Sequence, residues 1–296
     1  MNLIVGATGL LGSEICRLLT AAGQPLRTLI RATTDPDKVE NLKRLGAELV
    51  EGDLKDRASL DIACQGITAI ISTASSVHSQ QPYDTIQSVD QEGQLNLIEA
   101  ARAAGVARFI YISYSGNIDI DSPLTRAKRT VEQHLKQSGI AYTILRPSYF
   151  MEVWLSPALG FDVANAKAQV YGSGQNKISY ISFQDVARFA VHCLDHPAAR
   201  NTTIELGGPE SLSQLEVVRI FEELAGRKFE VQHVPEETLQ NQQAAATNLL
   251  QQSFAALMLD YAQGDSIDMR STLKVFPVQL TSVRELNLIP ANDIAE

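Results

Sequence analysis

The sequence has few cysteines, and none of them lies close to another. Cys16, Cys64 and Cys193 are far apart and form no Cys-x-x-Cys pair. This spacing argues against a disulfide framework and predicts buried, reduced thiols in a reducing compartment.

Long hydrophobic runs are also missing, because no stretch reaches about 18 uninterrupted apolar residues. The first residues enter an apolar segment without a basic leader. We therefore expect no membrane partner and no secretion signal, and we expect a cytoplasmic protein.

Positive charge is scarce. The sequence has 25 Lys and Arg residues against 34 Asp and Glu residues, a formal net charge of −9. Acidic residues interrupt the nearest approach to a basic cluster, which lies between Arg27 and Arg44. Without a basic run, such a protein is not expected to bind nucleic acid. The remaining composition, 45% hydrophobic and 20% charged, is that of an ordinary globular protein.

The first half of the chain alternates short β-branched runs with longer amphipathic segments. This alternation is typical of successive βαβ units and a parallel sheet. Strands are expected near 3–5, 26–30, 48–51, 69–72, 109–113 and 142–146, and helices are expected to begin near residues 10, 36, 56, 91 and 123. The sequence therefore predicts an α/β fold, with a doubly wound parallel Rossmann sheet over residues 1–150 that binds NAD(P).

Beyond Pro147 the alternation weakens. Gly172-Ser173-Gly174 lies between strand-like residues and predicts a β-hairpin over 170–181. Helices are expected over 183–194, 213–225 and parts of 236–262, and strands over 202–206 and 229–234. We expect residues 151–296 to form a smaller α/β substrate lobe that partly returns to the Rossmann sheet.

A glycine-rich turn follows the first expected strand and opens the first expected helix, which is the context that dinucleotide binding requires. Gly6 permits the tight turn, Gly9 lets the backbone approach a pyrophosphate, and Gly12 lets the helix pack close to the strand. Backbone N–H groups at the helix start would face the phosphates. The expected cofactor contacts of the turn are Gly6, Thr8, Gly9, Leu10, Leu11 and Gly12. A strand-helix corner without a ligand is the alternative.

Arg31 stands at the end of the second strand, where an NAD-specific site would carry an acidic residue for the ribose hydroxyls. A guanidinium suits a 2′-phosphate by charge and geometry. We therefore expect NADP(H) as the cofactor and NAD(H) as the less favoured one, although a solvated arginine would leave the same pattern.

The ends of the third and fourth strands add to this expected cleft. Asp53 and Leu54 follow the third strand, where the carboxylate could accept a hydrogen bond from an adenine amino group or could instead cap a helix. Thr73, Ala74 and Ser75 follow the fourth strand, where small residues would let a flat cofactor lie close.

Lys128 interrupts an apolar stripe on the helix that begins near Pro123. It could pass harmlessly over the edge of the core. Alternatively, it could point into the cleft, hydrogen-bond the nicotinamide ribose and lower the pKa of a nearby acid.

Four segments together resemble the atypical short-chain dehydrogenases, and within them the NmrA-like and isoflavone-reductase-like group. These segments are GATGLLG at 6–12, GAELVEGDL at 46–54, EAARAAGVARFIYIS at 99–113 and AYTILRPSYFME at 141–152. The resemblance implies a Rossmann domain, an NADPH cofactor and cofactor contacts that include Ser113 and Pro147. Members include reductases of quinones, enones and benzylic ethers, redox-sensing regulators and photosystem assembly factors.

The sequence departs from the usual Tyr-x-x-x-Lys motif of short-chain dehydrogenases, since Lys128 matches the lysine but Leu124 stands at the tyrosine position. Tyr114 aligns with the serine that often polarises the substrate. Reductases in the isoflavone-reductase-like branch also lack the tyrosine and keep the lysine, so reduction remains open.

The leading hypothesis is an NADPH-dependent reductase that transfers hydride to a small conjugated acceptor such as a quinone, an enone or a related aromatic compound. Lys128 and Tyr114 are the candidate catalytic residues, and Tyr149, Tyr83 and His78 are other candidate proton donors. The alternative is a redox sensor or regulatory or assembly protein that binds NADP(H) without catalysis and acts through a protein partner or as a homodimer. His192 and His196 lack the glutamate of a His-Glu-x-x-His motif, so no metal site is expected.

Overall fold

The computed structural model describes residues 1–77, 79, 81 and 83–288. The chain divides into two compact units. The first unit comprises Met1–Ser113, Arg126–Leu145 and Val186–Ile204, and the second comprises Tyr114–Thr125, Arg146–Asp185 and the chain from Glu205 onward. The chain passes between the units several times, and the expected assignment of separate functions to 1–150 and 151–296 stays a prediction.

The first unit is built on a seven-stranded sheet in the order β10-β6-β5-β4-β1-β2-β3. The strands are β1 (Asn2–Val5), β2 (Leu26–Ile30), β3 (Glu48–Glu51), β4 (Ala69–Ser72), β5 (Arg108–Ile112), β6 (Ala141–Pro147) and β10 (Thr202–Leu206). β1 pairs in parallel with both β2 and β4. The strand order therefore reverses at β1, and in open α/β sheets a ligand binds at the carboxyl ends of the strands beside such a reversal.

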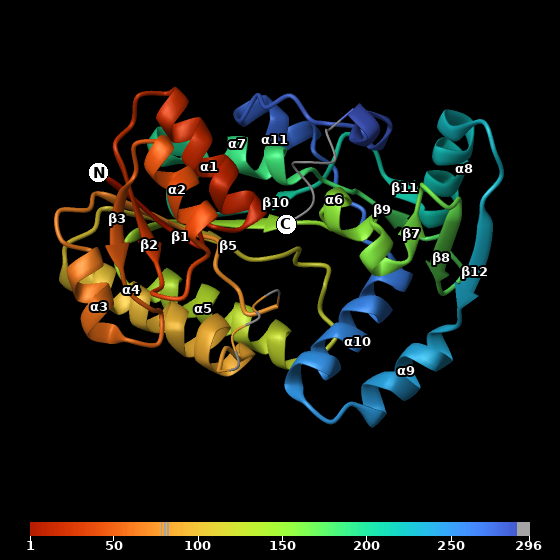
Figure 1. Ribbon diagram of the computed structural model, residues 1–296, viewed down its shortest axis with the longest axis horizontal. Helices are drawn as coiled ribbons and strands as arrows, with labels where there is room; N and C mark the ends of the chain where they lie inside the picture. The colour runs from red at the N-terminus through yellow and green to blue at the C-terminus, as the bar shows by residue number, and fades with distance from the viewer. Residues whose placement is uncertain (78, 80, 82, 289–296) are drawn as a thin grey trace. The chain divides into compact units, whose positions relative to one another are not determined.

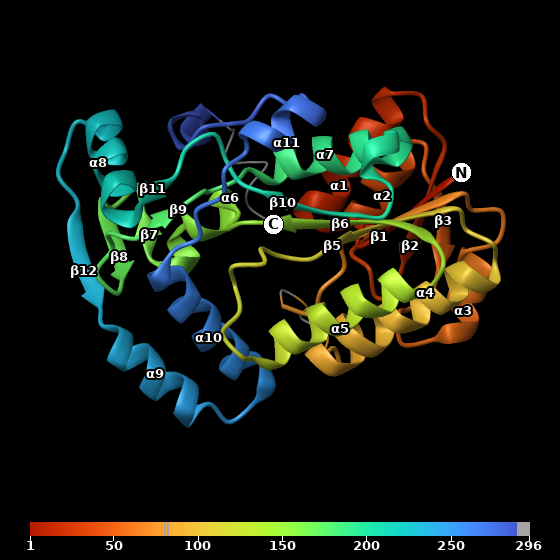
Figure 2. The same ribbon diagram turned by 180° about the vertical axis from the view of Figure 1, so that it is seen from behind.

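Helices cover both faces of this sheet. α1 (Leu10–Ala21), α2 (Pro36–Arg44) and most of α7 (Phe183–Asp195) lie on one face, while α3 (Arg57–Ala63), α4 (Gln94–Ala103) and α5 (Pro123–Gln137) lie on the other (Figures 1 and 2). The apolar core includes Leu3, Ile70, Phe109 and Ile144 from the strands and Leu97 from α4. The predicted doubly wound α/β Rossmann fold is confirmed.

The residues before α4 form a π-helix, η1 (Ile86–Gly93), instead of the expected start of an α-helix near Gln91. Thr85 caps it, because the Thr85 side chain accepts a hydrogen bond from the Ser88 backbone N–H. A π-helix widens each turn by one residue and is frequent at functional sites.

The second unit contains two small sheets. β12 (Glu230–Val234), β8 (Lys167–Tyr171) and β7 (Phe161–Asp162) form one, and β11 (Leu212–Ser213) pairs with β9 (Lys177–Ile178) in the other. Its helices are α6 (Met151–Trp154), α8 (Gln214–Ala225), α9 (Glu236–Ala245), α10 (Leu249–Gln263) and α11 (Arg270–Val275). Short 3-10 helices lie at Pro157–Leu159, Pro197–Ala199 and Val283–Leu288.

The hairpin expected over 170–181 is wrong. β8 pairs with β7 and β12, whereas β9 pairs with β11. Gly172 and Gly174 do adopt positive φ angles, as a turn requires, but β12 and β7 occupy the two edges of β8. The two glycines therefore form the predicted turn, but the strands on either side of it do not pair with each other.

Candidate functional site

The glycine turn is packed too closely for a side chain at two of its three glycines. Gly6 has a φ of +88°, and a Cβ atom there would lie 2.5 Å from the Oγ1 atom of Thr73. Gly9 is the N-cap of α1 and has no side chain to cap the helix. At Gly12 a Cβ atom would lie 2.1 Å from the Gly6 carbonyl oxygen. Only glycines fit the first and third positions, and the start of α1 has no acidic residue in its first turn.

The rim after β4 is tied directly to this turn. The Thr73 hydroxyl donates to the carbonyl oxygens of Val5 and Gly6, each at 3.2 Å. Ala74 is half-buried, and the Ser75 hydroxyl accepts a hydrogen bond from the Val77 backbone N–H at 3.4 Å. The turn and the small residues after β4 therefore lie together, as the sequence predicted.

Arg31 lies beside an acidic residue that the sequence did not point to. Its Nη1 atom is 2.5 Å from the Oδ2 atom of Asp84, and Lys55 donates a short hydrogen bond to the other oxygen of that carboxylate. The Asp84 side chain is only 2% exposed, while 40% of the Arg31 side chain is exposed. Two cations are thus held on one buried carboxylate at the carboxyl end of β2.

Asp53 also interacts with Lys55. Its Oδ1 atom accepts the Lys55 backbone N–H at 2.8 Å, and its Oδ2 atom is 3.1 Å from the Lys55 ammonium. A third of the side chain remains exposed. Leu54 is buried and packs against Gly93 of η1.

Lys128 is 6% exposed and its ammonium lies 3.8 Å from the Oδ1 atom of Asp90 on η1. The ammonium also stands 5.2 Å above the ring of Tyr111. Burial lowers the pKa of Lys128, while the carboxylates of Asp90 and Glu132 act in the opposite direction. Lys128 therefore does not pass over the edge of the core into solvent, because its ammonium is buried beside a carboxylate.

Asp90 is fully buried and is fixed from the other side by Ser76, whose backbone N–H and hydroxyl both donate to Oδ2, at 3.0 and 2.5 Å. Its Oδ1 atom has no hydrogen-bond partner among the described residues. Ser113 is buried, and its hydroxyl donates to Glu132 on α5 at 2.6 Å.

Tyr114, Leu124 and Pro147 lie in the second unit. The Tyr114 hydroxyl donates to Thr125 at 2.8 Å, and both residues line a small pocket with Leu124, Ser253 and Asp260. Burial raises the pKa of Asp260 to about 7. Leu124, which stands at the tyrosine position of the Tyr-x-x-x-Lys motif, is 6% exposed. Pro147 ends β6 and is buried.

The other proposed proton donors differ sharply in exposure. Tyr83 is 81% exposed. Tyr149 is 3% exposed, and its hydroxyl has no hydrogen-bond partner in the described part of the chain. Burial, together with the charges of Asp260 and Asp265, raises the pKa of Tyr149 well above its ordinary value. His78 lies outside the described residues.

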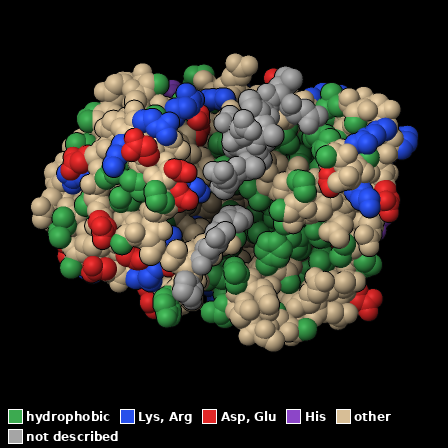
Figure 3. Space-filling model, viewed as in Figure 1, with side chains coloured by type: hydrophobic (Ala, Val, Ile, Leu, Met, Phe, Trp, Pro, Cys, Tyr) green, Lys and Arg blue, Asp and Glu red, His purple; other side chains and the backbone are tan. Residues whose placement is uncertain are grey.

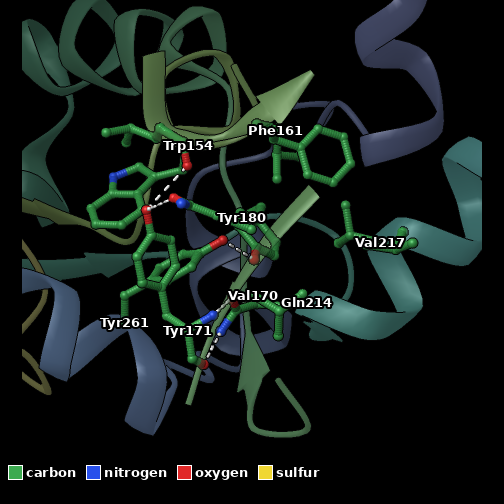
Figure 4. Close-up of a pocket in the computed structure, with 12 residues that line it drawn as sticks. Trp154, Phe161, Val170, Tyr171, Tyr180, Gln214, Val217 and Tyr261 are labelled. Atoms are coloured by element: carbon green, nitrogen blue, oxygen red, sulfur yellow. Dashed lines mark hydrogen bonds between the residues drawn. The ribbon is translucent and has the colours of Figure 1, made fainter. Parts of the chain in front are cut away.

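A larger pocket of the second unit is rich in aromatic rings (Figure 4). Its free space holds about one water molecule. Trp154 stacks on Tyr261 with ring centroids 4.2 Å apart, and the hydroxyls of Tyr180 and Tyr261 are 2.5 Å apart. The Gln214 side-chain oxygen accepts the Tyr171 backbone N–H, and the Gln214 NH2 group donates to the Tyr171 carbonyl oxygen. These rings pack on one another and belong to the apolar core of the second unit.

α10 also presents apolar side chains to solvent. Leu249, Leu250 and Phe254 are 50%, 45% and 40% exposed, and Figure 3 shows hydrophobic side chains gathered over this helix. None of the helices in residues 1–77 and 83–288 combines the length and apolar character that crossing a bilayer requires.

The described residues hold no group of three or more His, Cys, Asp or Glu side chains that could bind a metal ion. The rings of His192 and His196 lie 5.2 Å apart. All three cysteines are buried and unpaired, as the sequence predicted.

Sequence reasoning missed Lys55, Asp84 and Asp90. Lys55 follows Asp53 and Leu54 directly, so the end of β3 was a signal that could have found it. Asp84 and Asp90 lie outside any recognisable motif, and only their buried contacts with Arg31, Lys55 and Lys128 identify them.

Comparison with known proteins gives the family. The model of the NmrA-like family matches residues 2–285. The chain is 35% identical over 240 residues to the photosystem II assembly factor Ycf39 of Trieres chinensis, which covers 79% of this chain and 72% of the relative. It is 32% identical over 230 residues to an NAD(P)H azoreductase of Xenophilus azovorans, covering 77% and 74% of the two chains.

A solved structure of AtPrR2 with NADP+ and (+)-pinoresinol is also similar, with 25% identity, a TM-score of 0.79 and coverage of 96% of both chains. The resemblance expected from the four segments is confirmed: this chain belongs to the NmrA-like family.

Proposed function

We propose that this chain binds NADP(H) at the carboxyl ends of β1, β2 and β4 and reduces a small conjugated acceptor. The observation that carries the proposal is the turn at Gly6, Gly9 and Gly12, where Gly9 leaves the start of α1 without a capping side chain. A Cβ atom at Gly6 would collide with Thr73, so this glycine keeps the turn packed against the end of β4. The turn thus fits a pyrophosphate, which backbone N–H groups at a helix start bind well.

Each part of the cofactor then has a proposed partner. The glycine turn would hold the pyrophosphate through Gly6, Thr8, Gly9, Leu10, Leu11 and Gly12. Arg31 would pair with the 2′-phosphate, which makes NADP(H) the favoured cofactor over NAD(H). Asp53 would face the adenine, and Lys128 would hold the nicotinamide ribose.

When bound, NADPH supplies a hydride. The chain contributes placement, which can be worth about 7 to 11 kcal/mol when two reactants are held in a reactive geometry. The Lys128 ammonium would support negative charge that develops on the acceptor. Tyr114 is the proposed proton donor, because its hydroxyl is hydrogen-bonded and only half-buried, unlike that of Tyr149.

We assign cofactor binding to residues 1–150 and acceptor binding to residues 151–296. The reductase reading is supported by the similarity to an azoreductase and to a protein solved with (+)-pinoresinol. Quinones, enones and azo compounds are therefore the first acceptors to test.

The test is titration of the purified chain with NADPH and NADH, followed by NADPH oxidation at 340 nm with a panel of these acceptors. Arg31→Ala is expected to weaken NADPH binding and leave NADH binding unchanged. Lys43→Ala is the matched control, since it removes one exposed positive charge from α2. Lys128→Ala is expected to reduce turnover. Equal affinity of the wild type for both cofactors would refute the role of Arg31.

A second candidate function is a regulatory or assembly protein that binds NADP(H) without turnover and acts through a protein partner. Two observations favour it: the similarity to an assembly factor and the apolar Leu124 at the tyrosine position. The exposed apolar side chains of α10 would suit a partner surface. Tight NADPH binding with no oxidation across the acceptor panel would favour this candidate.

A further inference from the structure

The environment of Asp84 is unusual for a residue with no assigned role. Its side chain is 2% exposed, yet it accepts hydrogen bonds from three side chains. Arg31 and the Ser79 hydroxyl both donate to Oδ2 at 2.5 Å, and Lys55 donates to Oδ1. Burial alone would raise the pKa of Asp84, but the hydrogen bonds from Lys55, Ser79 and Arg31 lower it, so the carboxylate is ionised at neutral pH.

The charges around Asp84 balance. Arg31 and Lys55 are positive, and Asp84 and Asp53 are negative, with Asp53 3.1 Å from the Lys55 ammonium. An incoming phosphate therefore meets two cations whose charge is already neutralised. A dianion placed beside these four groups would be attracted by the cations and repelled by the Asp84 carboxylate.

We propose that Asp84 sets the cofactor selectivity of this site by competing with the 2′-phosphate of NADP(H) for Arg31 and Lys55. The inference rests on the proposed NADP(H) function and adds two residues to it: Lys55 as a second phosphate-binding cation and Asp84 as its opposing anion. A bound 2′-phosphate must displace the Asp84 carboxylate or share the two cations with it. Asp84 thereby weakens NADP(H) binding and leaves NAD(H) binding untouched, because NAD(H) carries a hydroxyl at that position.

The decisive variant is Asp84→Asn, which keeps the size of the side chain and removes its charge. We expect the dissociation constant for NADPH, measured by fluorescence titration of the full chain, to fall about tenfold, equivalent to about 1.4 kcal/mol. The dissociation constant for NADH should stay unchanged. Glu40→Gln is the matched control, because it removes one exposed negative charge from α2 and should alter neither constant. Unchanged or weaker NADPH binding in Asp84→Asn would overturn the proposal, since Asp84 would then align the cations and not compete with the phosphate.

Lys55→Met provides an independent arm if Asp84→Asn does not fold. It should weaken NADPH binding about tenfold at low salt, and this loss should shrink as salt is added, because salt screens exposed charges. Equal loss for NADH would refute Lys55 as a phosphate ligand. A wild type that binds neither cofactor would refute the proposed function itself, whereas a wild type that binds NADPH and shows no gain in Asp84→Asn refutes only this inference.

Discussion

The buried pair of Lys128 and Asp90 allows one prediction to be worked out in detail. The two charged atoms are 3.8 Å apart, and the side chains are 7% and 0% exposed. At this separation their attraction is about 4 kcal/mol with the effective dielectric constant of about 20 that suits protein sites. Removing one partner of such a pair leaves an unpaired buried charge, which typically costs about 3 to 5 kcal/mol.

Asp90→Asn is the cleanest perturbation, because its carbonyl oxygen can keep the hydrogen bonds from Ser76 while the charge is lost. We expect a loss of about 3 kcal/mol in the free energy of unfolding at pH 7. At about 2 to 4 °C per kcal/mol for a chain of this size, the Tm should fall by about 6 to 12 °C. Thermal denaturation followed by circular dichroism measures it.

The pH dependence separates charge from packing. Burial lowers the pKa of Lys128 below its ordinary value of 10.5, and the Asp90 charge opposes this effect. In Asp90→Asn the pKa falls further, so between that pKa and about 10.5 the unfolded chain binds more protons than the folded one. Stability of the variant therefore rises with pH in this window, and its deficit relative to the wild type should shrink from pH 7 to pH 10.

Two controls complete this experiment. Ser76→Ala removes the hydroxyl hydrogen bond to Asp90 without changing any charge, so its deficit should be the same at both pH values. The double variant Asp90→Asn/Lys128→Met removes both charges and should recover much of the lost stability. A deficit in Asp90→Asn that does not depend on pH would refute the reasoning, since Lys128 would then not carry a charge that Asp90 balances.

Three further predictions concern the rest of the molecule. Gly12→Ala should lower the free energy of unfolding by about 1 to 3 kcal/mol or more and should also lower NADPH affinity, because its Cβ would lie 2.1 Å from a backbone oxygen of the turn. Gly9→Ala has room, at 3.6 Å from the nearest atom, and should lower the affinity alone. Thermal denaturation and cofactor titration distinguish the two variants. Burial raises the pKa of Asp260 to about 7, so the folded state holds the Asp260 proton more tightly than the unfolded chain does. Stability therefore falls as the pH rises from about 4 to 7. Asp260→Asn should flatten this part of a curve of Tm against pH, and an unchanged slope would contradict the prediction. Burial raises the pKa of Cys16 and of Cys193 to about 12. A thiol reagent at pH 8 should therefore label both cysteines only after the chain unfolds. Rapid labelling of the folded chain would disprove their burial.

The sequence predicted the first unit closely. The strands at 26–30, 48–51, 69–72 and 202–206 have the predicted bounds, because short β-branched runs between glycine stop signals report local conformation directly. The glycine turn was equally readable, since its φ angle and its close backbone contacts are steric demands that only glycine meets.

Other features depended on which distant segments meet. The residues around Gly172 and Gly174 carried a correct turn signal, but the sequence could not say that β12, some sixty residues later, would occupy the edge of β8. Strand partners depend on the order of strands in a sheet, which local periodicity does not encode.

The sequence by itself therefore determined the Rossmann fold, the glycine turn and the presence of Arg31 and Lys128 at the expected strand end and helix. Only the tertiary structure decided what balances those two charges. Asp84 and Asp90 are separated from their cationic partners by 53 and 38 positions, and a carboxylate carries no signal of its partner until folding removes both charges from water. Burial turned two ordinary aspartates into the groups that we propose control cofactor choice and hold Lys128.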